Sequence, residues 1–301
     1  MSTRGAGQTG SLPAFLKKRI ACGNAAGRVR KAVSSLTTIC EEGRCPNRSE
    51  CFASGTATFL IMGPSCTRAC GYCSVEKGAV QPLDAREPVR VAEAVRELGL
   101  RYAVITSVTR DDLPDGGLDH YVVTVSAIRE ASPACEIEVL VPDFVQLEDR
   151  VGTIDRLLAN GIAVFNHNIE TVKELFPVVR PQASYEWSLE LLSYAARLSS
   201  VYGYSVKSGF MVGLGESDAQ VQNLLRDLAD AGVDIVTIGQ YLRPTRAHRP
   251  PARYVTPEEF ETYAAYAREA GIAHVVSGPF VRSSYHAREV RAAVVSLRGR
   301  E

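Results

Sequence analysis

From residue 58 onward, short β-rich runs alternate with amphipathic helical patterns, and this alternation limits the folds open to the chain. The runs are rich in β-branched or aromatic residues and span residues 58–62, 102–106, 137–141, 164–166, 205–212, 235–238 and 273–277. Helical patterns cover residues 89–98, 187–198 and 218–231, and another begins at Pro257 after an N-cap at Thr256. Repeated strand–helix units form a parallel sheet with helices outside it. Six or seven such units predict an α/β fold, a partial (β/α)6 barrel of the TIM type, rather than a closed eightfold barrel.

The composition is that of a folded protein with a large core. Of the 301 residues, 46% are hydrophobic and 23% are charged, and 34 basic residues balance 34 acidic ones. The zero net charge argues against a dedicated nucleic-acid-binding protein and against a disordered chain. No run of about 18 uncharged apolar residues occurs, so the sequence predicts no membrane-spanning helix.

Charge is distributed unevenly along the chain. Residues 1–40 hold seven Lys or Arg and no Asp or Glu. Such a start is typical of a transit peptide, and it is equally compatible with a folded arm that packs on an acidic body. We expect an N-terminal arm over residues 1–57, the partial barrel over 58–280 and a C-terminal segment over 281–301. No secretory signal is evident, so we expect a cytoplasmic location, or an organellar one if residues 1–12 belong to a transit peptide.

Six of the eight cysteines form two compact triplets. The first triplet is Cys40, Cys45 and Cys51, spaced C-x4-C-x5-C. The second triplet is Cys66, Cys70 and Cys73, spaced C-x3-C-x2-C. The two remaining thiols, Cys22 and Cys135, are isolated and are interpreted as packing residues.

The triplets favour iron–sulfur clusters over the other uses of cysteine. Structural zinc requires four ligands, usually in C-x2-C pairs, and the five histidines lie far from both triplets in the sequence. A disulfide framework fits poorly because the chain carries no export signal. Three thiolates suit a cubane cluster that leaves one iron open. We therefore expect one cluster in each triplet, with zinc and disulfides as the alternatives.

Polar residues gather where the predicted strands end, which is the edge at which such folds place their chemistry. These residues are Ser107, Asp111, Asp143, Asn168, Glu170, Glu216 and Gln240. The carboxylates of Asp111, Asp112 and Asp115 have a spacing that a divalent cation can use. The neighbouring Pro and Gly residues favour instead a tight polar loop over the site. The histidines are interpreted as core or surface groups.

The second triplet lies in the segment C-T-R-A-C-G-Y-C, residues 66–73, which resembles the signature of radical S-adenosylmethionine (SAM) enzymes. The resemblance implies that its three thiolates hold a 4Fe–4S cluster whose open iron is chelated by the amino and carboxylate groups of SAM. Reductive cleavage of SAM then gives methionine and a 5′-deoxyadenosyl radical, which abstracts hydrogen from an unactivated carbon. Tyr72 matches the aromatic residue that the superfamily often places against adenine.

Further motifs resemble those of the lipoyl synthase family. They are residues 38–47 (TICEEGRCPN), 110–117 (RDDLPDGG), 141–144 (VPDF), 166–170 (NHNIE), 239–244 (GQYLRP) and 282–285 (RSSY). The resemblance covers nearly the whole chain, from about residue 13 to residue 287. It implies insertion of two sulfur atoms at C6 and C8 of an octanoyl chain, which is carried as an amide on a lysine of a lipoyl carrier domain. Two SAM molecules are consumed, one for each carbon.

By the same resemblance, the first triplet binds a second, auxiliary 4Fe–4S cluster, which is dismantled to supply the sulfur. A serine of the RSSY motif then provides the fourth ligand. We assign Ser284, with Ser283 as the runner-up, because sequence does not separate adjacent hydroxyls. A hard oxygen ligand on a soft cluster is expected to be labile. The alternative for both serines is an N-cap of a short helix that begins near Tyr285.

The segment GFMVGLGE, residues 209–216, resembles the fifth-strand motif of the superfamily, in which apolar residues flank adenine. Met211 and Val212 are the candidates for that contact. Glycines in this segment permit a close approach of the backbone to the ligand.

Polar contacts to SAM are expected from four further residues. Asn168 and Glu170, at the end of the fourth predicted strand, are placed to bind the ribose hydroxyls. Arg180 and Lys207 are the cationic candidates for the SAM carboxylate. For each charged residue, the alternative is a solvated group at the rim of the barrel.

The implied partners are octanoylated lipoyl carrier domains, namely 2-oxoacid dehydrogenase acyltransferase subunits and the glycine cleavage carrier protein. An electron donor such as ferredoxin or flavodoxin and an iron–sulfur carrier that rebuilds the auxiliary cluster are also implied. Neither nucleic acid nor a membrane is expected as a partner. Two rivals remain: another radical SAM sulfur-inserting enzyme, of the biotin-synthase-like or methylthio-transferring kind, and a structural or electron-transfer protein that carries zinc or clusters. The spacing of the first triplet argues against the first rival.

Overall fold

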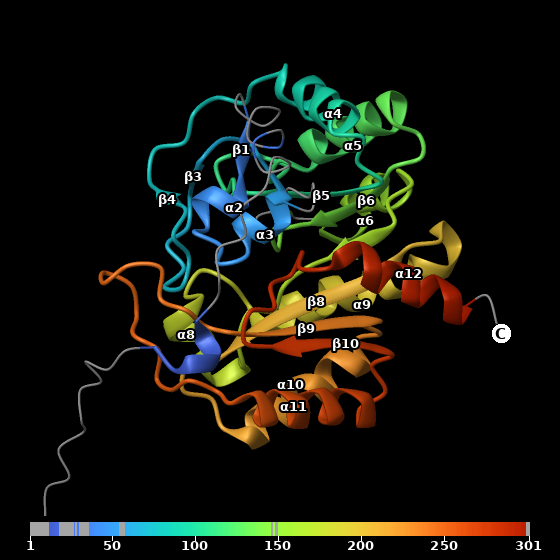
Figure 1. Ribbon diagram of the computed structural model, residues 1–301. Helices are drawn as coiled ribbons and strands as arrows, with labels where there is room; N and C mark the ends of the chain where they lie inside the picture. The colour runs from blue at the N-terminus through green and yellow to red at the C-terminus, as the bar shows by residue number, and fades with distance from the viewer. Residues whose placement is uncertain are drawn as a thin grey trace, which may run out of the picture.

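A computed structural model of the chain describes residues 12–17, 27, 29, 36–53, 58–145, 147 and 150–298. Its central element is an eight-stranded sheet in the order β1-β2-β5-β6-β7-β8-β9-β10 (Figure 1). The strands are β1 (Thr37–Thr38), β2 (Thr58–Ile61), β5 (Tyr102–Ser107), β6 (Glu136–Leu140), β7 (Val164–Asn166), β8 (Ser205–Val212), β9 (Ile235–Gln240) and β10 (His274–Gly278). All neighbouring strands are parallel except β1 and β2, which are antiparallel.

The seven strands predicted from residue 58 onward are confirmed, with bounds that differ by no more than two residues. After β2 and after each of β5 to β9, helices precede the next strand of the sheet, which gives six strand–helix units, and β10 is a seventh parallel strand. The order of the sheet ends at β1 on one side and β10 on the other, so the strands of the described residues do not close into a ring. The predicted partial (β/α)6 barrel is therefore confirmed.

Helices cover the outside of the sheet. After the strands follow α4 (Glu87–Glu97), α5 (Leu118–Ala131), α6 (Arg150–Thr153), α7 (Asp155–Leu158), α8 (Phe176–Val179), α9 (Tyr185–Tyr202), α10 (Asp218–Asp230), α11 (Pro257–Glu269) and α12 (Ala287–Arg298). Thr256 caps α11 as predicted, since its side chain accepts a hydrogen bond from the backbone of Glu259. The four predicted helical patterns correspond to α4, α9, α10 and α11.

Two long helices, α5 and α12, were not predicted from the sequence. In α5 the buried residues Leu118, Tyr121, Val125 and Ile128 form one stripe at helical spacing. A β-branched run, Val122–Val123–Thr124–Val125, obscures that stripe in the sequence. Tertiary packing decides the structure here, because the stripe lies against the sheet.

The ends of the chain pack on the open barrel. Short elements near the N-terminus are η1 (Ala14–Leu16), α2 (Ile39–Glu42) and α3 (Arg48–Ala53). At the other end, Arg291 Nη1 of α12 donates to Ser205 Oγ at 2.9 Å, and Ala287 packs on Tyr102 and Val104. Because Tyr102 and Ser205 open β5 and β8, α12 crosses the amino ends of these strands, as Figure 1 shows.

The main hydrophobic core joins residues of several of these parts. It includes Cys40 and Val29 from the N-terminal arm together with strand and helix residues of the barrel. The division into segments 1–57, 58–280 and 281–301 stays a prediction. Within the described residues, no helix is both long and apolar enough to cross a bilayer. Cys22 lies outside the described residues, whereas Cys135 is buried and free.

Candidate functional site

The second triplet occupies a single loop that follows β2. The short parallel strands β3 (Ser65–Cys66) and β4 (Glu76–Lys77) flank it. All three thiols, Cys66, Cys70 and Cys73, are free and partly exposed. Backbone hydrogen bonds from Gly71 to Val179 (3.0 Å) and from Gly78 to Cys66 (3.1 Å) tie the loop to the barrel and to itself.

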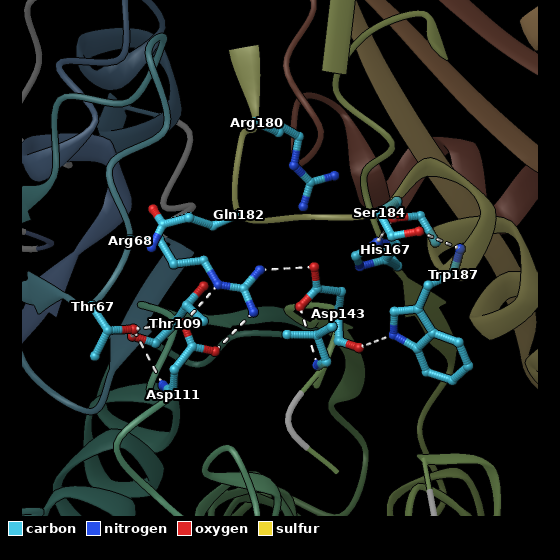
Figure 2. Close-up of polar contacts among 12 residues, drawn as sticks. Thr67, Arg68, Thr109, Asp111, Asp143, His167, Arg180, Gln182, Ser184 and Trp187 are labelled. Carbon is cyan, nitrogen blue, oxygen red and sulfur yellow. Dashed lines mark hydrogen bonds and ion pairs between the residues drawn. The ribbon is translucent and has the colours of Figure 1, made fainter. Parts of the chain in front are cut away.

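Arg68, between the first two cysteines, is the main support of this loop. Its side chain is only 4% exposed. Nε and Nη2 donate to the two carboxylate oxygens of Asp111 at 2.8 Å, and Nη1 donates to Asp143 Oδ2 at 2.8 Å (Figure 2). Asp111 follows β5 and Asp143 follows β6, so one guanidinium fastens the cysteine loop to the carboxyl ends of two strands.

The charge of Arg68 keeps the buried carboxyl group of Asp143 ionised. Burial opposes ionisation of Asp143, but the Arg68 guanidinium outweighs it and holds the pKa of Asp143 below its usual value. Trp187 Nε1 donates to the backbone carbonyl of Asp143, and Asp143 itself is fully buried (Figure 2). A buried carboxylate of this kind is stable only while its cation is present.

The three carboxylates that have a cation-like spacing are all engaged in protein contacts. Asp111 binds Arg68, and Asp112 accepts two hydrogen bonds of 2.8 Å from Arg110. Asp115 accepts from the backbone N–H groups of Gly117 and Asp119. These contacts favour a tight polar loop over a divalent-cation site as the interpretation of the three aspartates.

The sulfur atoms of the loop are partly shielded from water. Cys66 Sγ accepts from the backbone N–H groups of Thr109 (3.3 Å) and Arg68 (3.4 Å). Burial raises the pKa of Cys73 to about 11 and raises the pKa of Cys70 as well. These two thiols therefore remain protonated at neutral pH until a metal replaces the proton.

An apolar patch lies next to this loop. Tyr72 and Met211 pack on a small cluster formed by Val179, Leu214 and Tyr241. Val212, the residue after Met211, has its side chain in the main core with no exposed surface, because successive side chains of a strand point to opposite faces. The structure thus brings together Tyr72 and Met211 and places Val212 elsewhere.

Asn168, Glu170 and Arg180 lie together beyond the end of β7. The backbone of Glu170 has a φ of 70° and pairs with β8, since its N–H donates to the carbonyl of Gly209 at 2.9 Å. Burial raises the pKa of Glu170, while Arg180 opposes that rise. Arg180 Nη1 donates to the carbonyl of Asn168 at 3.0 Å, and its buried Nε has no partner among the described residues. These side chains combine an acceptor, a donor and a cation beside the triplet.

Lys207 is separated from this group by its own ion pair. Its side chain is 2% exposed, and Nζ lies 3.0 Å from Oε1 of Glu138, which is 1% exposed. Tyr102 and Asn166 also donate to the Glu138 carboxylate, at 2.7 and 2.8 Å. Glu138 already neutralises the ammonium inside the barrel, so we do not propose Lys207 as a contact of the SAM carboxylate.

The first triplet lies in a cavity that the C-terminal segment completes. The residues that line it are Cys40, Cys45, Asn47, Cys51, Thr58, Arg282, Ser284 and Tyr285. Three hydrogen bonds hold the two ends of the chain together here. They run from Asn47 Nδ2 to Phe280 O (2.7 Å), from Thr58 Oγ1 to Ser284 Oγ (3.0 Å) and from Tyr285 Oη to Glu50 Oε1 (3.0 Å).

The two adjacent serines have different surroundings. Ser284 lines the cavity of the first triplet, whereas Ser283 Oγ accepts from Asn166 Nδ2 at 2.7 Å and donates to Asn168 Oδ1 at 3.0 Å. Helix α12 begins at Ala287, so neither serine is its N-cap. The geometry therefore separates two hydroxyls that the sequence leaves equivalent.

The donor set of this cavity fits a cluster better than a single ion. Among the described residues, no group of three His, Cys, Asp or Glu side chains is close enough to share one metal ion. A cubane binds each thiolate through a different iron atom, so its ligands stand further apart than those of zinc. Three free thiols and one serine hydroxyl around a cavity match that requirement.

Arg68 was not assigned a role from the sequence, and its partners Asp111 and Asp143 were expected at the edge of the site without their link to it. The signal was present: one arginine stands between two cysteines of a loop, and aspartates follow two neighbouring strands. Arg282, which lines the cavity of the first triplet, was likewise identified only through its motif.

Comparisons with known proteins agree with this geometry. A model of the Radical SAM superfamily matches residues 60–228. A lipoyl synthase of Rubrobacter xylanophilus is 52% identical over 92% of this chain and 85% of its own length. For those of Chlorobium chlorochromatii and Xanthomonas oryzae pv. oryzae the identities are 48% and 50%, over 92% and 91% of this chain and 94% and 82% of theirs.

Solved structures share the fold at low sequence identity. The crystal structure of methylornithine synthase (PylB) matches with a TM-score of 0.52 and 15% identity, over 83% of this chain and 81% of that one. Streptococcus suis SuiB bound to SAM matches with a TM-score of 0.56 and 13% identity, over 83% of this chain and 54% of that one. With half of the chain matched by the superfamily model and about half of its residues identical to those of the relatives, the chain belongs to the lipoyl synthase family of radical SAM enzymes.

Proposed function

We propose that the protein inserts two sulfur atoms, at C6 and C8, into an octanoyl chain held as an amide on a lysine of a carrier domain. Membership of the superfamily implies one 4Fe–4S cluster and SAM. The auxiliary cluster at the first triplet, held by Cys40, Cys45, Cys51 and Ser284, is part of the proposal. When bound, SAM and the two clusters supply the hydrogen-abstracting radical and the sulfur.

The observation that carries the proposal is the position of the Arg-Ser-Ser-Tyr segment. Ser284 faces the cavity of the first triplet, and Ser283 is hydrogen-bonded to Asn168 beside the second triplet. One peptide thus touches both candidate cluster sites. A reaction that abstracts hydrogen at one site and delivers sulfur from the other needs the two sites at a fixed separation.

The side chains of this protein bind and orient the reactants. Cys66, Cys70 and Cys73 of the second triplet hold the SAM-cleaving cluster, on a loop that Arg68 keeps in place. Tyr72 and Met211 cover the adenine, Asn168 and Glu170 bind the ribose hydroxyls, and Arg180 attracts the SAM carboxylate. The apolar wall of Val179, Leu214 and Tyr241 excludes water from the radical.

Octanoylated carrier domains are the proposed substrates, with ferredoxin or flavodoxin as the electron donor and an iron–sulfur carrier for rebuilding the auxiliary cluster. We propose a cytoplasmic location. The decisive experiment uses anaerobically reconstituted protein with SAM, dithionite and an octanoyl-lysyl peptide. The expected product has gained two sulfur atoms after reduction, as measured by mass spectrometry.

The same experiment separates the proposed function from its rivals. A biotin-synthase-like enzyme would act on a free small molecule and leave the octanoyl peptide unchanged. An electron-transfer or structural protein would not cleave SAM at all. If SAM is cleaved and the peptide gains no sulfur under any condition, the proposed function is wrong.

A further inference from the structure

The loop between β9 and α11 carries an unusual concentration of positive charge. From residue 242 to residue 253 it holds four arginines and one histidine, and no acidic residue. Arg253 is paired with Glu259 at 2.5 Å. The other three, Arg243, Arg246 and Arg249, are exposed and form no ion pair within the described part of the chain. We call these three the arginine patch.

The patch is anchored directly to the cysteine loop of the radical SAM site. His248 Nε2 donates to the backbone carbonyl of Cys73 at 3.0 Å, and its Nδ1 accepts from Thr245 Oγ1 at 2.8 Å. Cys73 is a proposed ligand of the cluster that cleaves SAM. One histidine ring therefore connects this ligand to the exposed arginine-bearing backbone.

Further contacts hold the loop against the wall of the proposed SAM site. Tyr241 Oη donates to the carbonyl of Arg249 at 2.8 Å, and the N–H of Ala252 donates to the carbonyl of Gly213 at 2.8 Å. Tyr241 also belongs to the apolar cluster on which Tyr72 packs. The loop, orange in Figure 1, lies at the carboxyl ends of the strands. It presents a fixed basic surface outside the radical SAM cluster.

We infer that the arginine patch is the docking surface for the protein that reduces this cluster, a small electron-transfer protein with an acidic face. The inference rests on the proposed function only in requiring a SAM-cleaving cluster at the second triplet. One electron passes from the reduced cofactor of the donor to the oxidised cluster, so the donor loses one electron and the cluster gains one. Attraction between the opposite charges of the patch and the donor raises the encounter rate of such partners and makes it depend on salt.

The octanoylated carrier domain is the competing occupant, and the contacts favour the electron donor. Hydrogen bonds of the loop reach Cys73, Gly213 and Leu214, all on the side of the second triplet. None among the described residues reaches the lining of the first-triplet cavity, where the sulfur acceptor must also fit. A donor needs proximity to the reducible cluster alone, and this is what the loop provides.

The test compares charge reversal of the patch with an equal reversal elsewhere. The variant is Arg243→Glu, Arg246→Glu, Arg249→Glu. The matched control is Arg197→Glu, Arg226→Glu, Arg268→Glu, three exposed arginines on α9, α10 and α11. Affinity of the holoenzyme for oxidised flavodoxin, the chosen acidic probe, is measured by calorimetry at low and high salt. This readout needs no turnover.

We expect the patch variant to bind flavodoxin about tenfold more weakly or worse at low salt, and to lose most of the salt dependence. The control should bind as the unaltered protein does. SAM cleavage driven by reduced flavodoxin should slow by a similar factor, whereas cleavage driven by dithionite should not change. A variant with Gln at the same three positions should lie between the two.

Three outcomes would overturn the inference. Equal flavodoxin affinity in both reversal variants removes the patch as a docking surface. A matching loss with dithionite makes the loop a structural part of the SAM site. A higher KM for an octanoylated carrier domain with unchanged flavodoxin binding assigns the patch to the carrier. Because no octanoyl substrate enters the first two measurements, absence of lipoyl product would contradict the proposed function and leave the docking result standing.

Discussion

The two cysteine triplets are held by different kinds of structure. Cys66, Cys70 and Cys73 lie on one loop whose supports, Arg68 and its carboxylates, come from the first half of the barrel. Cys40, Cys45 and Cys51 lie in a cavity whose other side is built by residues more than 220 positions later. The site of the second triplet depends on local packing around a buried charge network, and the site of the first triplet depends on contact between the two ends of the chain. This contrast predicts that each site can be disabled without the other.

The largest effects should come from removing one triplet at a time. Alanine at positions 66, 70 and 73 is expected to abolish SAM cleavage while the auxiliary cluster remains. Alanine at positions 40, 45 and 51 is expected to leave SAM cleavage and stop sulfur transfer. Iron content and 5′-deoxyadenosine release measure the two effects, and identical behaviour of both variants would refute the division of labour.

Next in size is the loss of the buried cation that supports the second triplet. Arg68→Gln leaves the fully buried Asp143 without its partner, which should lower the free energy of unfolding by about 3–5 kcal/mol. Arg110→Gln is the matched control. Its arginine is equally buried, but its partner Asp112 is 34% exposed, so the cost should be clearly smaller. Chemical denaturation followed by circular dichroism compares the two, and equal losses would contradict the special role of Arg68.

Acid should weaken the barrel through His167. Burial lowers the pKa of His167 to about 4, whereas the unfolded chain has the ordinary value of 6.5. Between pH 6.5 and 4, His167 therefore stays neutral in the folded state and binds a proton in the unfolded state. The free energy of unfolding should fall by about 3 kcal/mol as the pH drops from 6.5 to 4, with no contribution above that window. His167→Gln should remove this part of the pH dependence, and an unchanged profile would disprove it.

The adjacent serines sharpen the comparison of the two triplets, because Ser284 lines the cavity of the first triplet and Ser283 contacts Asn168 beside the second. Ser284→Ala should keep SAM cleavage and lower lipoyl product about a hundredfold, with 5′-deoxyadenosine released without product. Ser284→Cys should assemble the cluster and donate sulfur slowly, because a thiolate binds iron more softly. Ser283→Ala removes hydrogen bonds to Asn166 and Asn168 and should lower the free energy of unfolding by only about 1 kcal/mol. A larger loss of product in Ser283→Ala than in Ser284→Ala would exchange the two roles.

The smallest effect concerns SAM affinity alone. Glu170→Ala should weaken SAM binding by about 1–3 kcal/mol, because a ribose hydroxyl is left unpaired. Asn168→Ala should act in the same direction. Glu174→Ala, an exposed carboxylate nearby, is the control and should bind SAM normally. Calorimetry on reconstituted protein decides, and unchanged affinity in both site variants would remove these residues from the proposal.

Seven strands of the main sheet and the helices α4, α9, α10 and α11 could be predicted from the sequence because their signals are local. Periodicity located β2 and β5 to β10 within two residues, and Thr256 and Pro257 marked the start of α11. Helix α5 was missed since its β-branched run competes with its apolar stripe. Local patterns report secondary structure well only where propensity and packing agree.

Long-range contacts explain what the sequence left open in the site. The spacing of the cysteines gave both triplets, but only the fold separates Ser283 from Ser284 or pairs Lys207 with Glu138. Lys207 looked like a free cation because its partner lies 69 residues away. Side-chain neighbours of that kind depend on strand order, which no single segment encodes.

The dependence of the first-triplet cavity on Ser284 and Tyr285 also determines when this cavity can form during synthesis of the chain. The ribosome makes Cys40, Cys45 and Cys51 early, but Ser284 and Tyr285, which complete their cavity, emerge more than 230 residues later. The proposed auxiliary site therefore cannot mature before residue 285 has been made, and its contacts are among the most distant in sequence that the chain has to form. A ribosome-stalled chain that lacks residues 280–301 should fold its barrel and still be unable to retain the auxiliary cluster at the first triplet.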